Sequence, residues 1–159
     1  MSQLSVVTDQ RYAPLFRDWL TKQFGPHFED DSNRFIASVI QGETDFEICG
    51  VTALNKWGAH TCEAHAASDG SKRQKIDRKY IWTVFDYAFR HAGKNCLLTH
   101  VATENVKSIA LQHLLGLKHI GHIEGYYGEG KDAELFAITR QQWLDGKWGS
   151  LEAPTGDNS

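Results

Sequence analysis

A cluster of basic side chains at the start of a predicted helix is the first feature of the sequence that could bind a ligand. The run Ser71-Lys72-Arg73-Gln74-Lys75 follows a predicted strand and precedes a helical segment that begins at Asp77. The first turn of a helix has free backbone N–H groups and the positive end of the helix dipole, and both favour an anion. A phosphate-bearing ligand fits this position. A solvated helix start with scattered lysines would show the same pattern.

The basic charge of the chain is concentrated in this one segment, and its position at a helix start is what favours the ligand interpretation. Residues 72–94 contain seven basic and two acidic side chains, a net charge of +5, whereas the whole chain has a net charge of −3. Residues 1–71 have a net charge of −5, which suits a cationic amine or a basic peptide as a partner. The small total excludes a histone-like chain. We do not expect nucleic acid as a partner, although binding through residues 72–94 stays an alternative that steep salt dependence would reveal.

Three side chains on one predicted strand could in principle bind zinc. They are His60, Cys62 and His65, and imidazole and thiolate are ligands that zinc prefers. Successive side chains of a strand point to opposite faces, so these three do not share one face. We therefore expect no metal site.

Length and composition predict one domain that folds without disulfide bonds. The 159 residues correspond to one core, which we place at residues 1–148, and the polar residues 149–159 are expected to form a disordered tail. The three cysteines are widely spaced and odd in number, which fits a reducing compartment. There is no leader segment and no apolar run long enough for a membrane helix, so we expect a cytoplasmic protein without a membrane partner.

The spacing of apolar residues predicts the elements that position these side chains. A short strand at residues 4–7 is followed by a helix with an apolar stripe formed by Tyr12, Leu15, Phe16, Trp19 and Leu20. Three antiparallel strands follow, and then a central helix, a strand, a second helix with its own apolar stripe (Ile109, Leu111, Leu114, Leu115), and two strands. The expected ranges are 34–41, 46–55, 60–67, 77–89, 96–101, 105–115, 117–123 and 134–139. This order predicts an α/β protein of the α+β type, with a mixed, mostly antiparallel central sheet flanked by helices.

One segment carries a family resemblance. The run Asn105-Val-Lys-Ser-Ile-Ala-Leu-Gln-His-Leu-Leu-Gly-Leu-Lys-His-Ile-Gly121 closely resembles the C-terminal signature of the GNAT acyltransferase superfamily, and the predicted order of elements is similar to that fold. The resemblance extends from about Leu4 to Leu144. It is most specific after Tyr80, where further motifs recur in the expected order: Val84-Phe85-Asp86-Tyr87-Ala88-Phe89, Leu115-Gly116-Leu117, Asp132-Ala-Glu-Leu-Phe136 and Gln142-Trp143-Leu144. The chain looks most like the branch related to ribosomal-protein N-acetyltransferases, which includes bacteriophage members.

The resemblance implies a GNAT-like N-acetyltransferase that moves an acetyl group from acetyl-CoA, as cosubstrate, to a primary amine. In such folds the pantetheine arm pairs with the strand that here covers Cys62 to Ala67, and the pyrophosphate lies in the loop from Ser68 to Lys75. The implied acetyl-CoA-binding residues are Ala66, Ala67, Lys72, Arg73, Gln74, Lys75, Arg78, Asn105 and Ser108. For Asn105, a plain helix N-cap is the alternative role.

The implied reaction needs a base for the amine and a donor for the oxyanion. Glu63 and His65 alternate along one strand and share a face, so either is a candidate base. They could instead be a cross-strand pair and a buried side chain. A backbone N–H near Ala66 is the candidate oxyanion donor. The tyrosine that often protonates the leaving thiolate falls at Gln112, which leaves Ser108, Tyr126, Tyr127 or solvent for this step.

Departures from the family pattern keep a second function open. Gln74, Ile76 and Arg78 stand where the family loop has glycines that allow close approach of the backbone to pyrophosphate. The alternative is a catalytically degenerate GNAT-fold binding protein that acts through a host or virion protein partner. The acceptor pocket is expected at residues 24–33 and 121–131, which show no diagnostic pattern, so the amine is not identified. A homodimer is also left open.

Overall fold

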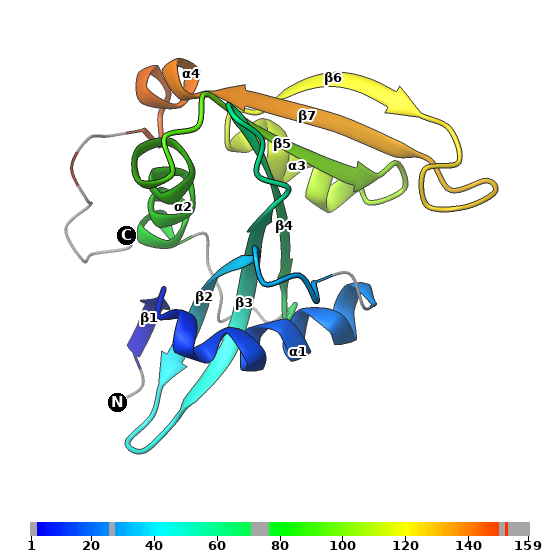
Figure 1. The fold of residues 1–159 in the computed structure, drawn as a ribbon. Helices are drawn as coiled ribbons and strands as arrows, with labels where there is room; N and C mark the ends of the chain where they lie inside the picture. The colour runs from blue at the N-terminus through cyan, green and yellow to red at the C-terminus, as the bar shows by residue number, and fades with distance from the viewer. Residues whose placement is uncertain (1–2, 26–27, 71–76, 150–151, 153–159) are drawn as a thin grey trace.

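A seven-stranded sheet with the order β1-β2-β3-β4-β5-β7-β6 forms the centre of the protein (Figure 1). The computed structural model describes residues 3–25, 28–70, 77–149 and 152. Neighbouring strands are antiparallel except β4 and β5, which are parallel. The fold class is therefore the one predicted. The strands are β1 (Gln3–Val7), β2 (Arg34–Gln41), β3 (Phe46–Asn55), β4 (Thr61–Ser68), β5 (Cys96–Ala102), β6 (Lys118–Ile123) and β7 (Ala133–Thr139).

Four α-helices accompany the sheet in the described part of the chain, and a polar side chain caps most of their starts. They are α1 (Ala13–Phe24), α2 (Arg78–Asp86), α3 (Val106–Leu114) and α4 (Arg140–Asp145). A 3₁₀ turn at Gln10–Tyr12 precedes α1, and α2 continues into a π-helical turn at Tyr87–His91. The side chains that accept a hydrogen bond from a backbone N–H at the start of these helical segments are Asp9, Asp77, Asn105 and Thr139.

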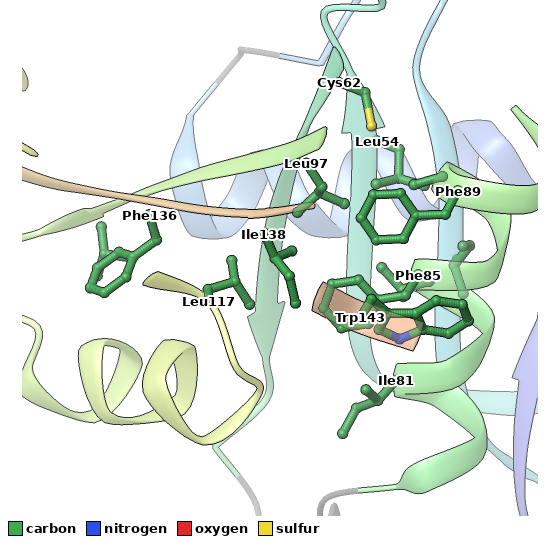
Figure 2. Close-up of a cluster of buried hydrophobic side chains, with 14 residues drawn as sticks. Leu54, Cys62, Ile81, Phe85, Phe89, Leu97, Leu117, Phe136, Ile138 and Trp143 are labelled. Atoms are coloured by element: carbon green, nitrogen blue, oxygen red, sulfur yellow. The ribbon is translucent and has the colours of Figure 1, made fainter. Parts of the chain in front are cut away.

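The helices cover both faces of the sheet, and each face has its own core. On one face Phe16 and Leu20 of α1 pack against Phe35 of β2 and Val51 of β3. On the other face α2 and α4 pack over β2 to β5 and β7, and Figure 2 shows Trp143 of α4 among the side chains of α2. Adjacent residues of one strand therefore face different helices.

Three predictions about the elements were incomplete or wrong. Helix α4 was not predicted, because its six residues are too few for a periodic apolar pattern. In α1 the predicted stripe is only half buried, since Tyr12 and Leu15 are 40% and 47% exposed. Helix α3 has no buried residue, and Leu111 and Leu114 of its predicted stripe are exposed, because this helix covers only the margin of the sheet.

The remaining expectations concern the ends of the chain and membranes. The predicted tail at 149–159 lies outside the described residues except for Gly149 and Glu152. None of the described helices is long and apolar enough to cross a membrane.

Candidate active site

The two parallel strands at the centre of the sheet pair only at their beginnings. Thr61, Cys62 and Glu63 of β4 lie opposite Cys96, Leu97 and Leu98 of β5. Both strands continue beyond these pairs, β4 to Ser68 and β5 to Ala102, but no β4–β5 pairing extends further among the described residues. The sheet therefore opens between the two strands, and the edge of each strand that faces the other presents backbone N–H and C=O groups for pairing.

A carboxylate and two imidazoles meet where the strands separate. Glu63 and His65 point to the same face of β4, and His100 lies on the corresponding face of β5, because Leu97 and Val101 of that strand are buried on the opposite face. Glu63 Oε1 is 3.7 Å from His65 Nε2 and 3.6 Å from His100 Nε2. The three side chains are 15–25% exposed, so they are shielded but still reachable.

A chain of amide hydrogen bonds determines which nitrogen of His65 carries a proton. Asn33 donates through Nδ2 to the carbonyl of Asp30 at 2.7 Å, and Asn55 donates through Nδ2 to Asn33 Oδ1 at 3.0 Å. The other polar atom of the Asn55 side chain is Oδ1, which can only accept a hydrogen bond. It lies 3.0 Å from His65 Nε2. With these assigned amide orientations, His65 Nε2 is the donor, so it does not accept a proton in this arrangement.

His100 is held from its other side by a tyrosine. Its Nδ1 lies 2.6 Å from the hydroxyl of Tyr127, which comes from the loop between β6 and β7. Burial lowers the pKa of His100, although the nearby Glu63 acts in the opposite direction. Burial also raises the pKa of Tyr127 to about 12. At neutral pH the pair is therefore a neutral imidazole and a protonated phenol, a combination able to accept and to donate a proton.

Aromatic rings from two distant segments line the cluster. The ring of Phe28, which follows α1, lies 5.8 Å from the ring of His65, and the rings of Tyr126 and Tyr127 lie 4.8 Å and 5.8 Å from His100. Lys56 is close as well, with Nζ 3.8 Å from Glu63 Oε1. The two aromatic segments fall in the ranges 24–33 and 121–131, where the sequence predicted an acceptor pocket.

The other predicted site residues lie outside this cluster of side chains. Ala66 and Ala67 directly follow His65 on β4, beyond the last β4–β5 pair, and Arg78 is the exposed first residue of α2. Lys72, Arg73, Gln74 and Lys75 lie outside the described residues. The three side chains weighed as zinc ligands, His60, Cys62 and His65, do not share one face, because Cys62 points into the core below α2 while His65 points to the opposite face.

Asn105 and Ser108 belong to the helix on the other face. Asn105 Oδ1 accepts a hydrogen bond from the backbone N–H of Ser108 at 3.2 Å, which is an N-cap contact. Gln112 of the same helix accepts a hydrogen bond from Thr99, whose side chain points away from the face of His100. Ser108 is therefore not part of the carboxylate and imidazole cluster.

Sequence reasoning missed His100 and Asn55. A signal for His100 was present: it lies on a predicted strand, at a position of the opposite parity to the apolar Leu97 and Val101. The parallel pairing of Thr61 with Cys96, which brings the two strands into register, could not be read from the sequence. Asn55 gave no signal, since a polar residue at a strand end is ordinary.

Comparisons with known proteins show similarity in fold. No family model matches the chain, and no curated protein matches it in sequence. A chimera of spermidine N-acetyltransferase SpeG from Vibrio cholerae and hSSAT has 18% sequence identity and a TM-score of 0.68, covering 91% of this chain and 100% of that chain. Spermidine N-acetyltransferase from Vibrio cholerae in complex with CoA and spermine has 19% identity and a TM-score of 0.66, covering 90% and 99%.

A dodecameric structure of spermidine N-acetyltransferase from Vibrio cholerae is similar too. It shows 18% identity and a TM-score of 0.64, and the match covers 91% of this chain and 96% of that chain. The likeness extends over nearly the whole length of each of these solved structures. The chain therefore has the fold of the GNAT acyltransferases.

Proposed function

We propose that the protein is an N-acetyltransferase that transfers the acetyl group of acetyl-CoA to a primary amine. The observation that carries the proposal is the opening between β4 and β5 with Glu63, His65 and His100 at its closed end. The fold adds support, because similar solved structures are spermidine N-acetyltransferases and one holds CoA and spermine. The acceptor is a primary amine, and spermidine and spermine are the first candidates to test.

The open strand edges suit the extended part of acetyl-CoA. Its pantetheine arm contains amide groups, which can pair with the backbone of β4 around Ala66 and Ala67 as a neighbouring strand would. The exposed Arg78 at the start of α2 stands where it can meet the phosphates, next to the basic residues 72–75 that lie outside the described residues. In this arrangement the thioester lies near Glu63, His65 and His100, at the branch point where β4 and β5 separate.

The reaction requires a neutral amine, and the cluster supplies groups to make one. Glu63 or His100 takes a proton from the ammonium group, and the amine nitrogen then attacks the thioester carbon. A backbone N–H near Ala66 stabilises the oxyanion that forms. After the C–N bond has formed, the nitrogen loses its second proton to solvent and the C–S bond breaks, and the CoA thiolate takes a proton from Tyr127 or from solvent. His65 stays a hydrogen-bond donor in this scheme, because its Nε2 proton is held by Asn55.

The test is an acetylation assay that follows free CoA thiol while acetyl-CoA is offered with a panel of amines. The panel contains spermidine, spermine, a short monoamine and a basic peptide. Glu63→Gln is expected to lower kcat by about 10²–10⁴-fold, as loss of a general base does. The matched control is Glu43→Gln, which makes the same chemical change in the exposed turn between β2 and β3 and is expected to leave kcat unchanged.

A separate binding measurement distinguishes the two functions considered. A ligand selective for the native state raises the melting temperature, so acetyl-CoA is expected to stabilise the protein in a concentration-dependent way. Stabilisation without turnover on any amine would favour the catalytically degenerate binding protein. No stabilisation at millimolar acetyl-CoA would contradict the proposed acetyltransferase.

A further inference from the structure

The carboxylate and the two imidazoles at the branch point have the composition of a metal site. Glu63 Oε1, His65 Nε2 and His100 Nε2 offer one ligand atom each, and these atoms all lie within 4.8 Å of one another. The two distances to Glu63 Oε1 are 3.7 Å and 3.6 Å. Ligand atoms that surround zinc tetrahedrally at 2.0–2.2 Å are about 3.3–3.6 Å apart, so only small movements would close the set around an ion.

A fourth candidate ligand atom, an amide oxygen, lies beside this set. Asn55 Oδ1 lies 3.0 Å from His65 Nε2, a hydrogen-bond distance that has to widen by a few tenths of an ångström to reach the separation of neighbouring ligands, and its Nδ2 is engaged with Asn33. Amide oxygen is an acceptable ligand alongside imidazole and carboxylate. In the ion-free state the proton on His65 Nε2 lies between these two atoms. A metal ion would displace that proton and occupy the space near it.

Contacts outside the ligand set hold His100 in the orientation that binding needs. Imidazoles that bind metals usually have their other nitrogen in a hydrogen bond, which determines the tautomer and the ring orientation. The Nδ1 of His100 has such a contact with the Tyr127 hydroxyl at 2.6 Å, so its Nε2 faces Glu63. Lys56 competes with an ion for Glu63, since its Nζ lies 3.8 Å from Glu63 Oε1, but the Lys56 side chain is 59% exposed and able to turn away.

We propose that Glu63, His65 and His100, with Asn55 as an oxygen ligand, bind one divalent transition-metal ion of the zinc class. Two imidazoles and a carboxylate select zinc or cobalt(II) over magnesium or calcium, which prefer all-oxygen sites. Binding itself does not depend on the proposed function. Within that function, an ion here occupies the groups that take the proton of the amine, so zinc acts as an inhibitor that a chelator reverses.

A second histidine and carboxylate cluster must be distinguished from this site. His122 lies 2.6 Å from Glu134 and 3.1 Å from Asp132, and it is exposed on β6. It could take up zinc by itself in a titration. His122→Ala is therefore the matched control for His100→Gln, because each variant removes one imidazole from one of the two clusters.

The experiment measures binding with the full chain, free of any histidine tag. Cobalt(II) is titrated while its visible absorption is followed, and bound zinc is counted by elemental analysis after dialysis. The wild type and His122→Ala are expected to bind one equivalent with the intense absorption of tetrahedral cobalt. Glu63→Gln and His100→Gln are expected to lose both the bound equivalent and its absorption. Circular dichroism and melting temperature show whether these variants fold. Lys56→Gln is expected to bind about two- to fivefold more tightly, because a competing exposed charge is gone.

The proposal is overturned by either of two results. One is a wild-type protein that binds no zinc or cobalt at millimolar concentration. The other is that the His100→Gln variant still binds one equivalent of metal while the His122→Ala variant binds none, which would assign the ion to the second cluster. Both results can be read from metal content alone, so they are independent of whether the protein acetylates an amine.

Discussion

The hydroxyl of Tyr127 lies 2.6 Å from Nδ1 of His100, which joins the loop between β6 and β7 to the open side of β5. The loop is itself well supported, since the backbone N–H of Tyr127 donates to the carbonyl of Lys131 at 2.9 Å and Gly125 N–H donates to Asp132 Oδ1 at 2.9 Å. Gly125 has a φ of 67°, a conformation that favours glycine. The hydrogen bonds of this loop therefore hold Tyr127 in position beside His100.

Loss of the Tyr127 hydroxyl is expected to slow the proposed acetyl transfer. Tyr127→Phe keeps the ring beside His100 but removes the group that orients the imidazole and can protonate the leaving thiolate. A general acid contributes at least about 10²-fold, and solvent can replace part of it, so kcat is expected to fall by about 10–10²-fold with little change in KM. The measurement is a steady-state assay with the best amine of the panel.

Tyr126→Phe is the control for this prediction. It removes the hydroxyl of the adjacent ring, which also lies against His100, and keeps the ring contact at 4.8 Å. We expect it to retain most of its activity. Equal losses in the two variants would mean that the rings matter through packing alone, and the proton-donor role of Tyr127 would be wrong.

Breaking the amide chain at Asn55 is expected to destabilise the fold. Asn33 and Asn55 are 3% and 7% exposed, and Asn55→Ala removes the hydrogen bonds that Asn55 makes with Asn33 Oδ1 and with His65 Nε2. An unsatisfied buried polar group costs about 1–3 kcal/mol, so the free energy of unfolding is expected to fall by about that amount. Urea denaturation measures it.

Two further variants make this prediction specific. Asn55→Asp is expected to be destabilising as well, because a carboxylate can accept from His65 but has no N–H to donate to Asn33. Asn95→Ala, at an exposed position before β5, is expected to change stability by less than about 0.5 kcal/mol. A stable Asn55→Asp variant would contradict the assigned direction of the hydrogen bonds.

The elements of the fold were predictable where the pattern was strong. The predicted ranges 34–41 and 46–55 coincide with β2 and β3, because both strands have long apolar runs and the turn between them begins at Gly42. Gly93 and Gly116 mark the ends of the two later helices, with φ of 68° and 92°. Helix α4 was missed since a six-residue helix has too few turns to show a period, although its Thr139 and Gln142 form a capping box.

The site was only partly predictable. Alternation along one strand placed Glu63 and His65 on a common face, and this holds in the structure. The sequence could not show that β4 and β5 pair over three residues and then separate, because strand pairing between distant segments is a tertiary relationship that local patterns do not report. His100 and Tyr127 join the site only through this geometry, which brings together residues that are 27 positions apart in the chain.

The cluster around Glu134 is expected to make stability depend on pH. Hydrogen bonds from Thr103 and His122 lower the pKa of Glu134 to about 2, from 4.5, and a further one comes from His119. The hydrogen bond to Glu134 raises the pKa of His122 above 6.5, and Asp132 adds to this effect. The lowered pKa stabilises the protein above pH 4.5, and this contribution is lost as the pH falls toward 2. The raised pKa stabilises it below pH 6.5, and this contribution is lost as the pH rises through the folded-state value.

Glu134→Gln tests this pH dependence. The difference in melting temperature between the wild type and this variant is expected to be largest between pH 4.5 and pH 6.5 and smaller on either side. Glu129→Gln, in the exposed loop between β6 and β7, makes the same change without these partners and is expected to show no such window. A difference that does not vary with pH would mean that Glu134 acts by packing and not by charge.

Trp143 is expected to tolerate phenylalanine far better than alanine. It is 1% exposed and lies 6.2 Å from the ring of Phe85 and 5.8 Å from that of Phe89 (Figure 2). Trp143→Ala removes this packing and is expected to lower the free energy of unfolding by about 3–5 kcal/mol. Its indole N–H is buried and has no acceptor among the described residues, so Trp143→Phe relieves a desolvation penalty while it leaves a small cavity. The two effects nearly offset, and the net cost is expected to be about 1 kcal/mol or less.

Trp148 provides the matched comparison for this last prediction. Its indole N–H donates to the carbonyl of Leu114 at 3.0 Å, so Trp148→Phe loses a hydrogen bond that Trp143→Phe does not. Although Trp148 is less buried, its replacement by phenylalanine is expected to cost about 1 kcal/mol. Urea denaturation of the three variants measures these differences. If Trp143→Phe costs as much as Trp143→Ala, the indole nitrogen of Trp143 has an acceptor, and the α4 core is held by that bond as well as by ring packing.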